Sequence, residues 1–302
     1  MRAYLLLLLV LASGPLHANS PVFSLRGLTV DFSPFSIVAD PGEGIDLPLL
    51  SGSLERAAFA EATPVEAAIS TDELHLSAPE KPGFYPLSLR LADGESVEIQ
   101  LFVTVPASKV RGKSLNGYRL GTPPPGHPRY PELYRAPNGF IEVSEAMLET
   151  RLSPHFTLRQ FLCKQESSYP KYVVVTESLL VMLEGLLAAV NERGFSIDTF
   201  GVISAYRTPW YNRKIGNVPN SRHVYGDAMD LFVDADKDGR MDDLNSDGVR
   251  DFKDVQLLAD IADEFMRQPG NSLIFGCVGR YRKTSRHGGF VHGDTRGYAS
   301  RW

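Results

Sequence analysis

Hydrophobic and polar positions alternate with a period of two in the first third of the chain. Every second position is apolar from 87 to 91 and again from 97 to 105. The Asp93-Gly94 pair between these runs favours the tight turn of a β-hairpin. Earlier apolar runs are shorter and are separated by proline and glycine, at 28–32, 37–38 and 45–47. This pattern predicts an all-β sandwich of immunoglobulin-like type over residues 20–106.

Helical spacing replaces this alternation in the second half of the chain. Apolar residues recur every three or four positions at 176–193 and 255–266, which predicts two helices with one buried face each. Gly194 ends the first of them. Short apolar runs predict strands at 200–204, 229–233, 272–275 and 289–292. A few strands among helices indicate an α+β domain over residues 151–302.

Residues 107–150 separate these two regions and differ from both. The stretch TPPPGHP at 122–128 is incompatible with regular helix or a central strand and favours an extended conformation. Three tyrosines make the segment too aromatic for a free tether. We therefore expect a multidomain protein whose linker packs against one or both domains.

The extreme N-terminus has the pattern of a secretory signal. Arg2 precedes an apolar run at 4–12, and Ala18 is a suitable cleavage point, so residues 1–18 are expected to be removed. The run is shorter than the roughly 18–20 residues that cross a bilayer, and no later stretch is a candidate span. We expect an exported protein, located in the periplasm or outside the cell.

Composition indicates a globular protein and argues against one class of binding partner. Of the 302 residues, 43% are hydrophobic and 22% are charged, which is ordinary for a globular protein. The formal net charge of -5 argues against a general nucleic-acid binder. Export permits a disulfide between Cys163 and Cys277, and two buried thiols are the alternative.

Two separate segments supply candidate metal ligands. His223 and Asp230 belong to the first segment, and His292 belongs to the second. Two histidines and one carboxylate form a three-ligand set for zinc, which leaves the fourth tetrahedral position for water. Asp294 follows His292 by two residues, so in a strand it points to the same side and can orient a ligand or a bound water.

These segments resemble the zinc D-alanyl-D-alanine carboxypeptidases and endopeptidases, peptidase family M15. SRHVYGDAMD at 221–230 fits the signature S-x-H-x-x-G-x-A-x-D, and SAYRTPWYN at 204–212 resembles a second motif. LSPHFTLRQFLCK resembles the start of the family's domain, and FGCVGRY with FVHGDTRGYASRW resembles its end. The resemblance covers about half of the chain.

The resemblance implies a role for each matched residue. It places zinc on His223, Asp230 and His292, and it directs Arg207 at the substrate carbonyl or carboxylate. A guanidinium is always charged and binds an oxyanion in a fixed geometry. Zinc polarises a scissile carbonyl and lowers the pKa of its water toward about 7.

One position departs from the family pattern. Many members carry a glutamate, the general base, three residues before the last zinc histidine, where this chain has Gly289. His287 and Asp294 are the nearby replacements, and His287 has a suitable pKa for proton transfer. Hedgehog signalling domains resemble the same fold and keep zinc without peptidase activity, so a non-catalytic protein is the alternative.

A tandem acidic repeat lies between the expected strand at 229–233 and the second helix. The pattern D-x-[DN]-x-D-G-x-x-D occurs twice in succession, at 234–242 and 243–251. Alternate oxygen ligands followed by a glycine are typical of calcium loops. The expected calcium ligands in this insert, 234–254, are Asp234, Asp236, Asp238, Asp242, Asp243, Asn245, Asp247, Asp251 and Asp254. We expect zinc in the site and structural calcium beside it.

The sequence thus predicts an exported zinc metallopeptidase that hydrolyses peptide bonds in the stem or cross-bridge peptides of peptidoglycan. Two alternatives stay open at this point. One is a zinc-containing cell-wall-binding protein without turnover. The other is a calcium-dependent adhesion or assembly factor in which the β-sandwich binds a cell-envelope protein.

Overall fold

Two β-sheets form the N-terminal part of the protein. The computed structural model describes residues 21–61 and 63–300, so the predicted signal at 1–18 lies outside the described residues. The five-stranded sheet has the order β2-β1-β4-β7-β6 and contains β1 (Val22–Leu25), β2 (Leu28–Val30), β4 (Gly44–Ser51), β6 (Glu66–Ile69) and β7 (Glu73–Ser77). The four-stranded sheet has the order β3-β9-β8-β5 and contains β3 (Phe35–Ala39), β5 (Ala58–Phe59), β8 (Gly83–Arg90) and β9 (Ser96–Val103).

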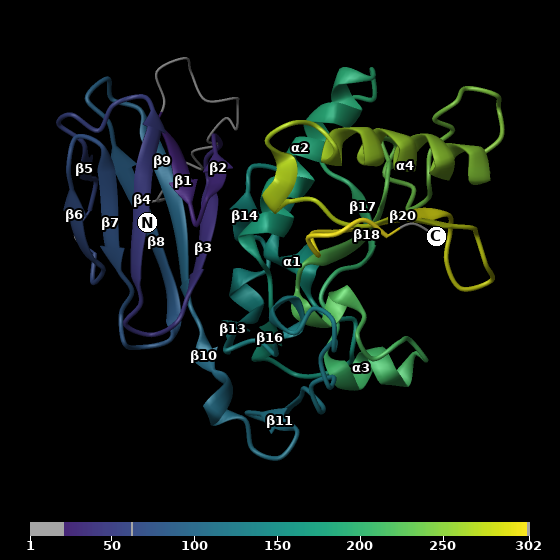
Figure 1. The fold of residues 1–302 in the computed structure, drawn as a ribbon, viewed down its shortest axis with the longest axis horizontal. Coiled ribbons are helices and arrows are strands. Elements are labelled where there is room, and N and C mark those ends of the chain that lie inside the picture. The colour runs from purple at the N-terminus through teal and green to yellow at the C-terminus, as the bar shows by residue number, and fades with distance from the viewer. Residues whose placement is uncertain (1–20, 62, 301–302) are drawn as a thin grey trace, which may run out of the picture.

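One hydrophobic core lies between these two sheets, which form the left-hand part of the molecule in Figure 1. Leu47 and Leu76 reach it from one sheet, and Ile37, Leu89 and Ile99 reach it from the other. The predicted hairpin is confirmed, because β8 and β9 pair antiparallel and their final pair, Arg90 with Ser96, lies next to the turn. β3 joins β9 in parallel. The immunoglobulin-like type of this unit stays a prediction.

The middle segment carries short elements that tie the two halves together. It contains β10 (Val105–Pro106), η1 (Ala107–Lys109), β11 (Ser114–Leu115), β12 (Tyr118–Arg119), η2 (Glu132–Tyr134), β13 (Gly139–Val143) and η3 (Glu145–Met147). β13 stands between β10 and β16 (Lys171–Val173) in a three-stranded sheet. Residues expected to be linker therefore pair directly with a strand of the C-terminal half.

The C-terminal half is built on a four-stranded antiparallel sheet of order β17-β18-β20-β19. Its strands are β17 (Gly201–Ser204), β18 (Ala228–Phe232), β19 (Val278–Tyr281) and β20 (Phe290–Asp294). The other elements are β14 (Arg151–Ser153), β15 (Phe156–Thr157), α1 (Leu158–Phe161), α2 (Glu177–Glu192), α3 (Pro209–Lys214), η4 (Arg222–Tyr225), α4 (Phe252–Met266) and η5 (Asn271–Leu273).

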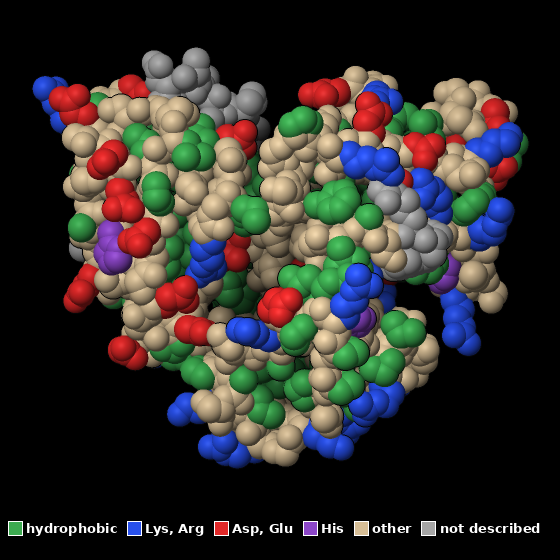
Figure 2. Space-filling model, in the orientation of Figure 1, with side chains coloured by type: hydrophobic (Ala, Val, Ile, Leu, Met, Phe, Trp, Pro, Cys, Tyr) green, Lys and Arg blue, Asp and Glu red, His purple; other side chains and the backbone are tan. Residues whose placement is uncertain are grey.

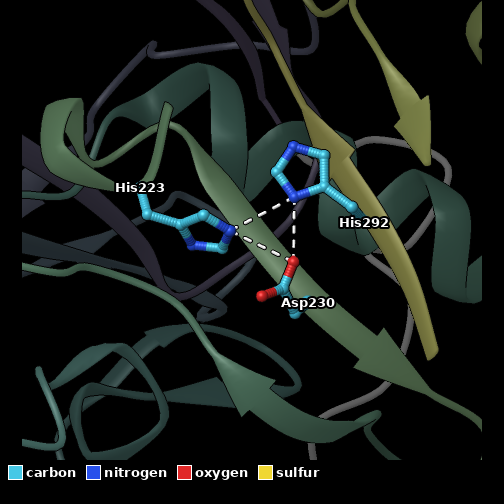
Figure 3. Close-up of side chains that lie close together, drawn as sticks. All are labelled: His223, Asp230 and His292. Carbon is cyan, nitrogen blue, oxygen red and sulfur yellow. Dashed lines mark hydrogen bonds and ion pairs between the residues drawn. The ribbon is translucent and has the colours of Figure 1, made fainter. Parts of the chain in front are cut away.

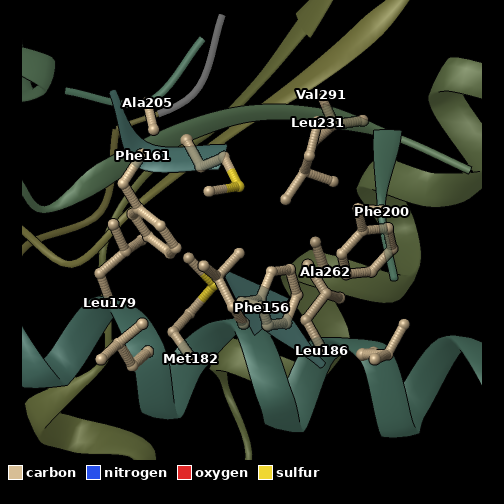
Figure 4. Packing of buried hydrophobic residues seen from close by; sticks show 14 of the residues in the cluster. Phe156, Phe161, Leu179, Met182, Leu186, Phe200, Ala205, Leu231, Ala262 and Val291 are labelled. Carbon is tan, nitrogen blue, oxygen red and sulfur yellow. The ribbon is translucent and has the colours of Figure 1, made fainter. Parts of the chain in front are cut away.

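Helices α2 and α4 cover one face of this sheet, and α3 lies on the other side (Figure 1). Met182 and Leu186 of α2 and Ala262 of α4 pack against Leu231 and Val291 of the strands, as Figure 4 shows. The opposite face of the same strands is therefore left for polar side chains, and it carries the candidate site.

Most predicted elements of this half are present, and one strand prediction was wrong. The helix expected at 176–193 is α2, and the one expected at 255–266 is α4, which begins three residues earlier. The strand expected at 272–275 is instead the 3-10 turn η5, preceded by Gly270 with φ of +97°. Asn271 donates a hydrogen bond of 2.8 Å to the carbonyl of Phe265, which holds this segment to the end of α4.

The N-terminal sheets dock on the C-terminal half through a buried polar contact. Glu177, at the first position of α2, accepts hydrogen bonds from the backbone N–H of Val38 at 3.0 Å and from Arg26 at 2.5 Å. Ser36 donates a hydrogen bond of 2.7 Å to the carbonyl of Leu152. Phe102 packs into the C-terminal core rather than between the two sheets.

Two further expectations concern cysteines and membrane spans. Cys163 and Cys277 are both buried free thiols, which is the alternative to a disulfide. Within the described ranges 21–61 and 63–300, no helix is both long and apolar enough to cross a membrane.

Glu177→Ala is expected to weaken this docking. The substitution leaves the Val38 N–H without its acceptor and lowers the free energy of unfolding by about 1–3 kcal/mol. Glu149→Ala is the control, since its ion pair with Arg159 is well exposed and contributes at most about 0.5 kcal/mol. Denaturant unfolding of both variants measures the difference, and equal losses would contradict a structural role for Glu177.

Candidate metal centre

Strand register brings two of the candidate ligands together. Asp230 of β18 and His292 of β20 are directly opposite partners in the antiparallel pair. Side chains alternate between the faces of a strand, so both point away from the face that Leu231 and Val291 present to the helices. The apolar-polar alternation that buries one face thus places a carboxylate and an imidazole side by side on the other.

A tight turn supplies the third ligand. His223 lies on η4, which ends at Gly226 with φ of +78°. A Cβ at this glycine would lie 2.4 Å from the carbonyl oxygen of Val174, and the Gly226 carbonyl itself accepts the N–H of Thr176 at 3.1 Å. Only glycine fits this conformation and this close approach. The turn therefore fixes His223 above β18.

The three side chains converge on one point, as Figure 3 shows. His223 Nε2 lies 3.1 Å from Asp230 Oδ1 and 3.2 Å from His292 Nδ1, and His292 Nδ1 lies 2.8 Å from Asp230 Oδ1. All three residues are at most 5% exposed. They form part of the wall of a cavity of about 680 Å³.

The hydrogen bonds around the two imidazoles suit a pair of metal ligands. His223 Nδ1 lies 2.6 Å from the carbonyl oxygen of Ala205, which can only accept, so Nδ1 carries the proton and Nε2 presents a lone pair. His292 Nε2 lies 2.9 Å from Asp294 Oδ2, which leaves Nδ1 to face the cluster. When His292 is neutral with its proton on Nε2, two nitrogen lone pairs and a carboxylate oxygen meet at this point. This donor set fits zinc and has the outer hydrogen bonds typical of zinc histidines.

Local electrostatics point the same way. Burial lowers the pKa of His223, and the same burial opposes ionisation of Asp230, yet attraction to His223 and hydrogen bonds from both histidines hold the pKa of Asp230 well below its usual range. Burial also lowers the pKa of His292, but hydrogen bonds to Asp230 and Asp294 outweigh it and raise that pKa to about 9. The two carboxylates beside His292 therefore favour a positive charge, either on that imidazole or on a metal ion that the three residues could hold.

Arg207 lies on the cavity wall next to Asp230. Its Nη2 donates to Asp230 Oδ2, and its Nε donates to Ser204 Oγ at 2.8 Å. Sequence reasoning directed this guanidinium at the substrate. The structure places it at the cavity and also gives it a second role, since it fixes the rotamer of a candidate ligand.

Asp294 has the contacts of a residue that positions His292. It is fully buried, and Arg296 and the backbone N–H of Cys277 donate to its carboxylate in addition to His292. Although burial raises the pKa of Asp294, these hydrogen bonds hold it far below the usual range. Its oxygens are therefore occupied on the side of His292 that faces away from the three-ligand cluster.

His287 differs from Asp294 because it lines the cavity. Its ring stands edge-on to Phe290 at a centroid distance of 5.0 Å, and Nδ1 lies 2.8 Å from the carbonyl oxygen of Gly288. A side chain at position 289 would be directed at α4, because a Cβ there would lie 2.7 Å from the Val255 side chain. A glutamate at 289 would meet the helix and not the cavity, so the family's usual base has no place at this position.

Two buried ion pairs beside the ligands were missed by sequence reasoning. Arg222, next to His223, donates twice to Asp227 at 3.0 Å, and its Nη1 donates to the carbonyl of Leu133 in the middle segment. Arg296 holds Asp294 in the same way. The signal available in the sequence was an arginine and an aspartate two to five residues apart near each ligand, at 222 and 227 and at 294 and 296.

The two acidic repeats fold into matching loops. Asp238 N–H binds Asp234 at 2.9 Å in the first, and Asp247 N–H binds Asp243 at 3.2 Å in the second. Lys237 and Ser246 have positive φ angles of 59° and 58° at equivalent positions. The repeat seen in the sequence is thus also a repeat of backbone conformation.

Only part of the expected calcium set comes together. Among the described residues, Asp234, Asp236 and Asp242 each offer an oxygen within 4.8 Å of the others. Asp254 is fully buried and accepts the N–H groups of Leu244 and Asp251, so it closes the loop and caps α4. The remaining candidates are Asp238, Asp243, Asn245, Asp247 and Asp251, and none belongs to that group of three.

These features define a buried group of three side chains that could hold a metal ion, on the polar face of the four-stranded sheet. The family model described as Peptidase M15 matches residues 154–250. The C-terminal region therefore contains a peptidase M15 domain, and the resemblance seen in the sequence is confirmed for this region. A domain of this family indicates a zinc peptidase acting on peptidoglycan-type substrates. No curated protein matches the chain.

The match includes Arg207, His223 and Asp230 and ends before His292. The third candidate ligand is therefore identified by the fold, since β20 pairs with β18 at the position of Asp230.

Gly226→Ala is expected to displace His223. The new Cβ collides with the Val174 carbonyl, so the turn must move, and stability should fall by more than about 2 kcal/mol together with a loss of zinc affinity. Gly216→Ala is the control, because Gly216 also has positive φ, of +81°, but a Cβ there meets nothing within 4 Å. Calorimetric zinc titration and thermal unfolding compare them, and equal behaviour would contradict the role of Gly226.

Proposed function

We propose that this protein is an exported zinc metallopeptidase that hydrolyses peptide bonds in the stem or cross-bridge peptides of peptidoglycan. The observation that carries the proposal is the convergence of His223, Asp230 and His292 within 3.2 Å of one another inside a peptidase M15 domain. The cavity of about 680 Å³ at these residues has the size of a ligand site.

His223, Asp230 and His292 would hold the zinc, and Arg207 and Asp294 would fix two of these ligands. When bound, zinc polarises a scissile carbonyl and makes water a nucleophile near neutral pH. Arg207 presents its positive charge at the same cavity wall and stabilises negative charge that develops on the carbonyl oxygen. Among the described residues that line the cavity, His287 is the one histidine outside the ligand set, and we assign it proton transfer.

Export and domain organisation complete the proposal. The signal pattern at 1–18 supports delivery to the periplasm or the cell exterior, where peptidoglycan lies. The two sheets at 21–106 form their own core, which supports a separate domain that binds a cell-envelope partner. The middle segment 107–150 joins this domain to the peptidase domain.

A second function is favoured by one observation. Among the described residues that line the cavity, Asp230 is the one carboxylate, and it belongs to the ligand set. A site without a glutamate base is consistent with a protein that binds cell-wall peptides through zinc and does not cleave them. The two functions differ in one measurable property, the appearance of products.

The proposed activity is expected in a digest of purified muropeptides. The zinc-loaded protein should release fragments that mass spectrometry assigns to one bond. His223→Ala should lower the rate by about 10³-fold or more, because the metal contributes several kcal/mol to the barrier. His287→Ala should lower kcat by about 10²-fold while zinc content stays at the wild-type level.

His75→Ala is the matched control, since this histidine lies on the N-terminal sheets and pairs with Asp46 at 2.6 Å, away from the cavity. It should cleave like the wild type. Tight binding of muropeptides without any fragment would reject hydrolysis and favour the binding function.

We also propose that the first acidic loop binds calcium. Asp234, Asp236 and Asp242 are its ligands, and the loop geometry supports this. Arg250 pairs with Asp236 at 2.8 Å and with Asp238 at 2.6 Å, so calcium must compete with this guanidinium. We therefore expect weak binding, in the range of about 10⁻⁴–10⁻³ M typical of extracellular modules.

Calorimetric titration with calcium tests this expectation. Calcium at tenfold Kd should stabilise the wild type by about 1.4 kcal/mol. Asp236→Asn should abolish the effect, and Asp247→Asn in the second loop should keep it. An absence of heat and of stabilisation in the wild type would reject the calcium proposal.

A further inference from the structure

The charged side chains that line the cavity are almost all cationic, although the chain as a whole has a net charge of -5. The single anion on the wall is Asp230, and the cations are Lys164, Arg207, Arg222, Arg286 and Arg296. A cavity with one dominant sign of charge raises the local concentration of oppositely charged ligands.

Three of the five cations have carboxylate partners within the protein. Arg207 pairs with Asp230, Arg222 pairs with Asp227, and Arg296 pairs with Asp294. Each of these pairs is buried and holds a segment of the metal centre in place. Arg222 and Arg296 are therefore occupied within the protein, and Arg207 already has the role at the reacting carbonyl that the proposed function gives it.

Lys164 and Arg286 are different. Neither has a carboxylate within ion-pair distance in the described part of the chain, and both side chains are exposed at the cavity. Among the residues that the structure describes, the ammonium of Lys164 and the guanidinium of Arg286 are thus cations on the cavity wall that form no ion pair, although Lys164 lies close enough to Asp230 for its charge to be felt. A carboxylate of a bound molecule would supply that partner in each case.

These two cations flank the metal centre. Lys164 follows α1 and lines the cavity together with Ser204, the last residue of the edge strand β17. Arg286 lies in the loop between β19 and β20, so it comes from the opposite edge of the sheet. In the sheet order β17-β18-β20-β19, the ligand strands β18 and β20 stand between them.

The wall between these groups includes apolar side chains at the surface. Ile215 is 40% exposed and Val218 is 70% exposed, and both line the cavity on the segment after α3. Figure 2 shows the molecule hollowed at its right-hand side, between α3 and the β19–β20 loop as Figure 1 places them. A peptide that fits this cavity would place an uncharged stretch against the apolar wall and one anionic group at each of the two cations.

We propose that Lys164 and Arg286 are specificity-determining residues that bind two carboxylates of the peptide substrate, one on each side of the bond that is cut. The substrate class is an anionic peptide with at least two free carboxylates separated by small uncharged residues. This inference rests on the proposed peptidase function and names the substrate features that the same cavity selects.

Steady-state kinetics on a pair of synthetic stem peptides tests the proposal. One peptide keeps its free carboxylates and the other has them converted to amides. Lys164→Met and Arg286→Met should each raise KM for the free-carboxylate peptide about tenfold, the loss expected for one charge-assisted hydrogen bond, with kcat little changed. On the amidated peptide, wild type and variants should have the same high KM.

Lys283→Met is the matched control, because Lys283 is an exposed cation in the same loop as Arg286 and does not line the cavity. It should leave KM unchanged. The proposal is overturned if Lys164→Met and Arg286→Met leave KM unchanged, or if Lys283→Met raises it equally. Thermal unfolding confirms that each variant is folded.

Calorimetric binding separates this proposal from the proposed function. If the wild type cleaves neither peptide, the peptidase function fails, and binding of the intact free-carboxylate peptide then reads the two contacts directly. Weaker binding by both Met variants and by the amidated peptide would still support the carboxylate contacts. Equal binding by wild type and variants would reject them.

Discussion

The fold depends on one electrostatic constraint, the meeting of three buried electron-pair donors. Two imidazole nitrogens and a carboxylate oxygen lie within 3.2 Å of one another, and none of the three residues is more than 5% exposed. Such atoms repel unless a cation lies among them, and removing them from water makes the repulsion stronger. The surrounding protein therefore has to hold these side chains rigidly, and the proposed metal ion would balance the remaining repulsion between them.

Each layer of the structure contributes to that rigidity. α2 and α4 bury one face of the central sheet, and the register of β18 with β20 sets Asp230 opposite His292. Gly226 turns the chain so that His223 reaches the same point. Arg207 and Asp294 then fix the orientation of ligands from outside the cluster. The middle segment also contacts the site, because the Leu133 carbonyl accepts a hydrogen bond from Arg222. It therefore helps to hold the site in place and does not only connect the two halves.

Much of this architecture follows from local patterns in the sequence. Period-two and period-3.6 spacing located the β8–β9 hairpin, α2 and α4, because each buries one continuous apolar face. The candidate ligands His223 and Asp230 were predictable because their spacing belongs to a specific motif, whereas His292 was implied by the resemblance of a separate segment near the C-terminus. Long-range packing was not predictable: the pairing of β13 with β16 and the Arg222–Asp227 pair depend on contacts between distant segments. The direction of Gly289 toward Val255 also required the fold, since no local pattern tells which side of β20 faces α4.

X-ray absorption at the zinc edge of the purified full-length protein tests the metal centre most directly. We expect one zinc per chain, bound by two imidazole nitrogens and one carboxylate oxygen at about 2.0–2.2 Å, with a light atom in the fourth position. His292→Ala should remove one imidazole from the spectrum or abolish binding. A spectrum with sulfur ligands at about 2.3 Å, or a protein that takes up no zinc, would contradict a zinc site at His223, Asp230 and His292.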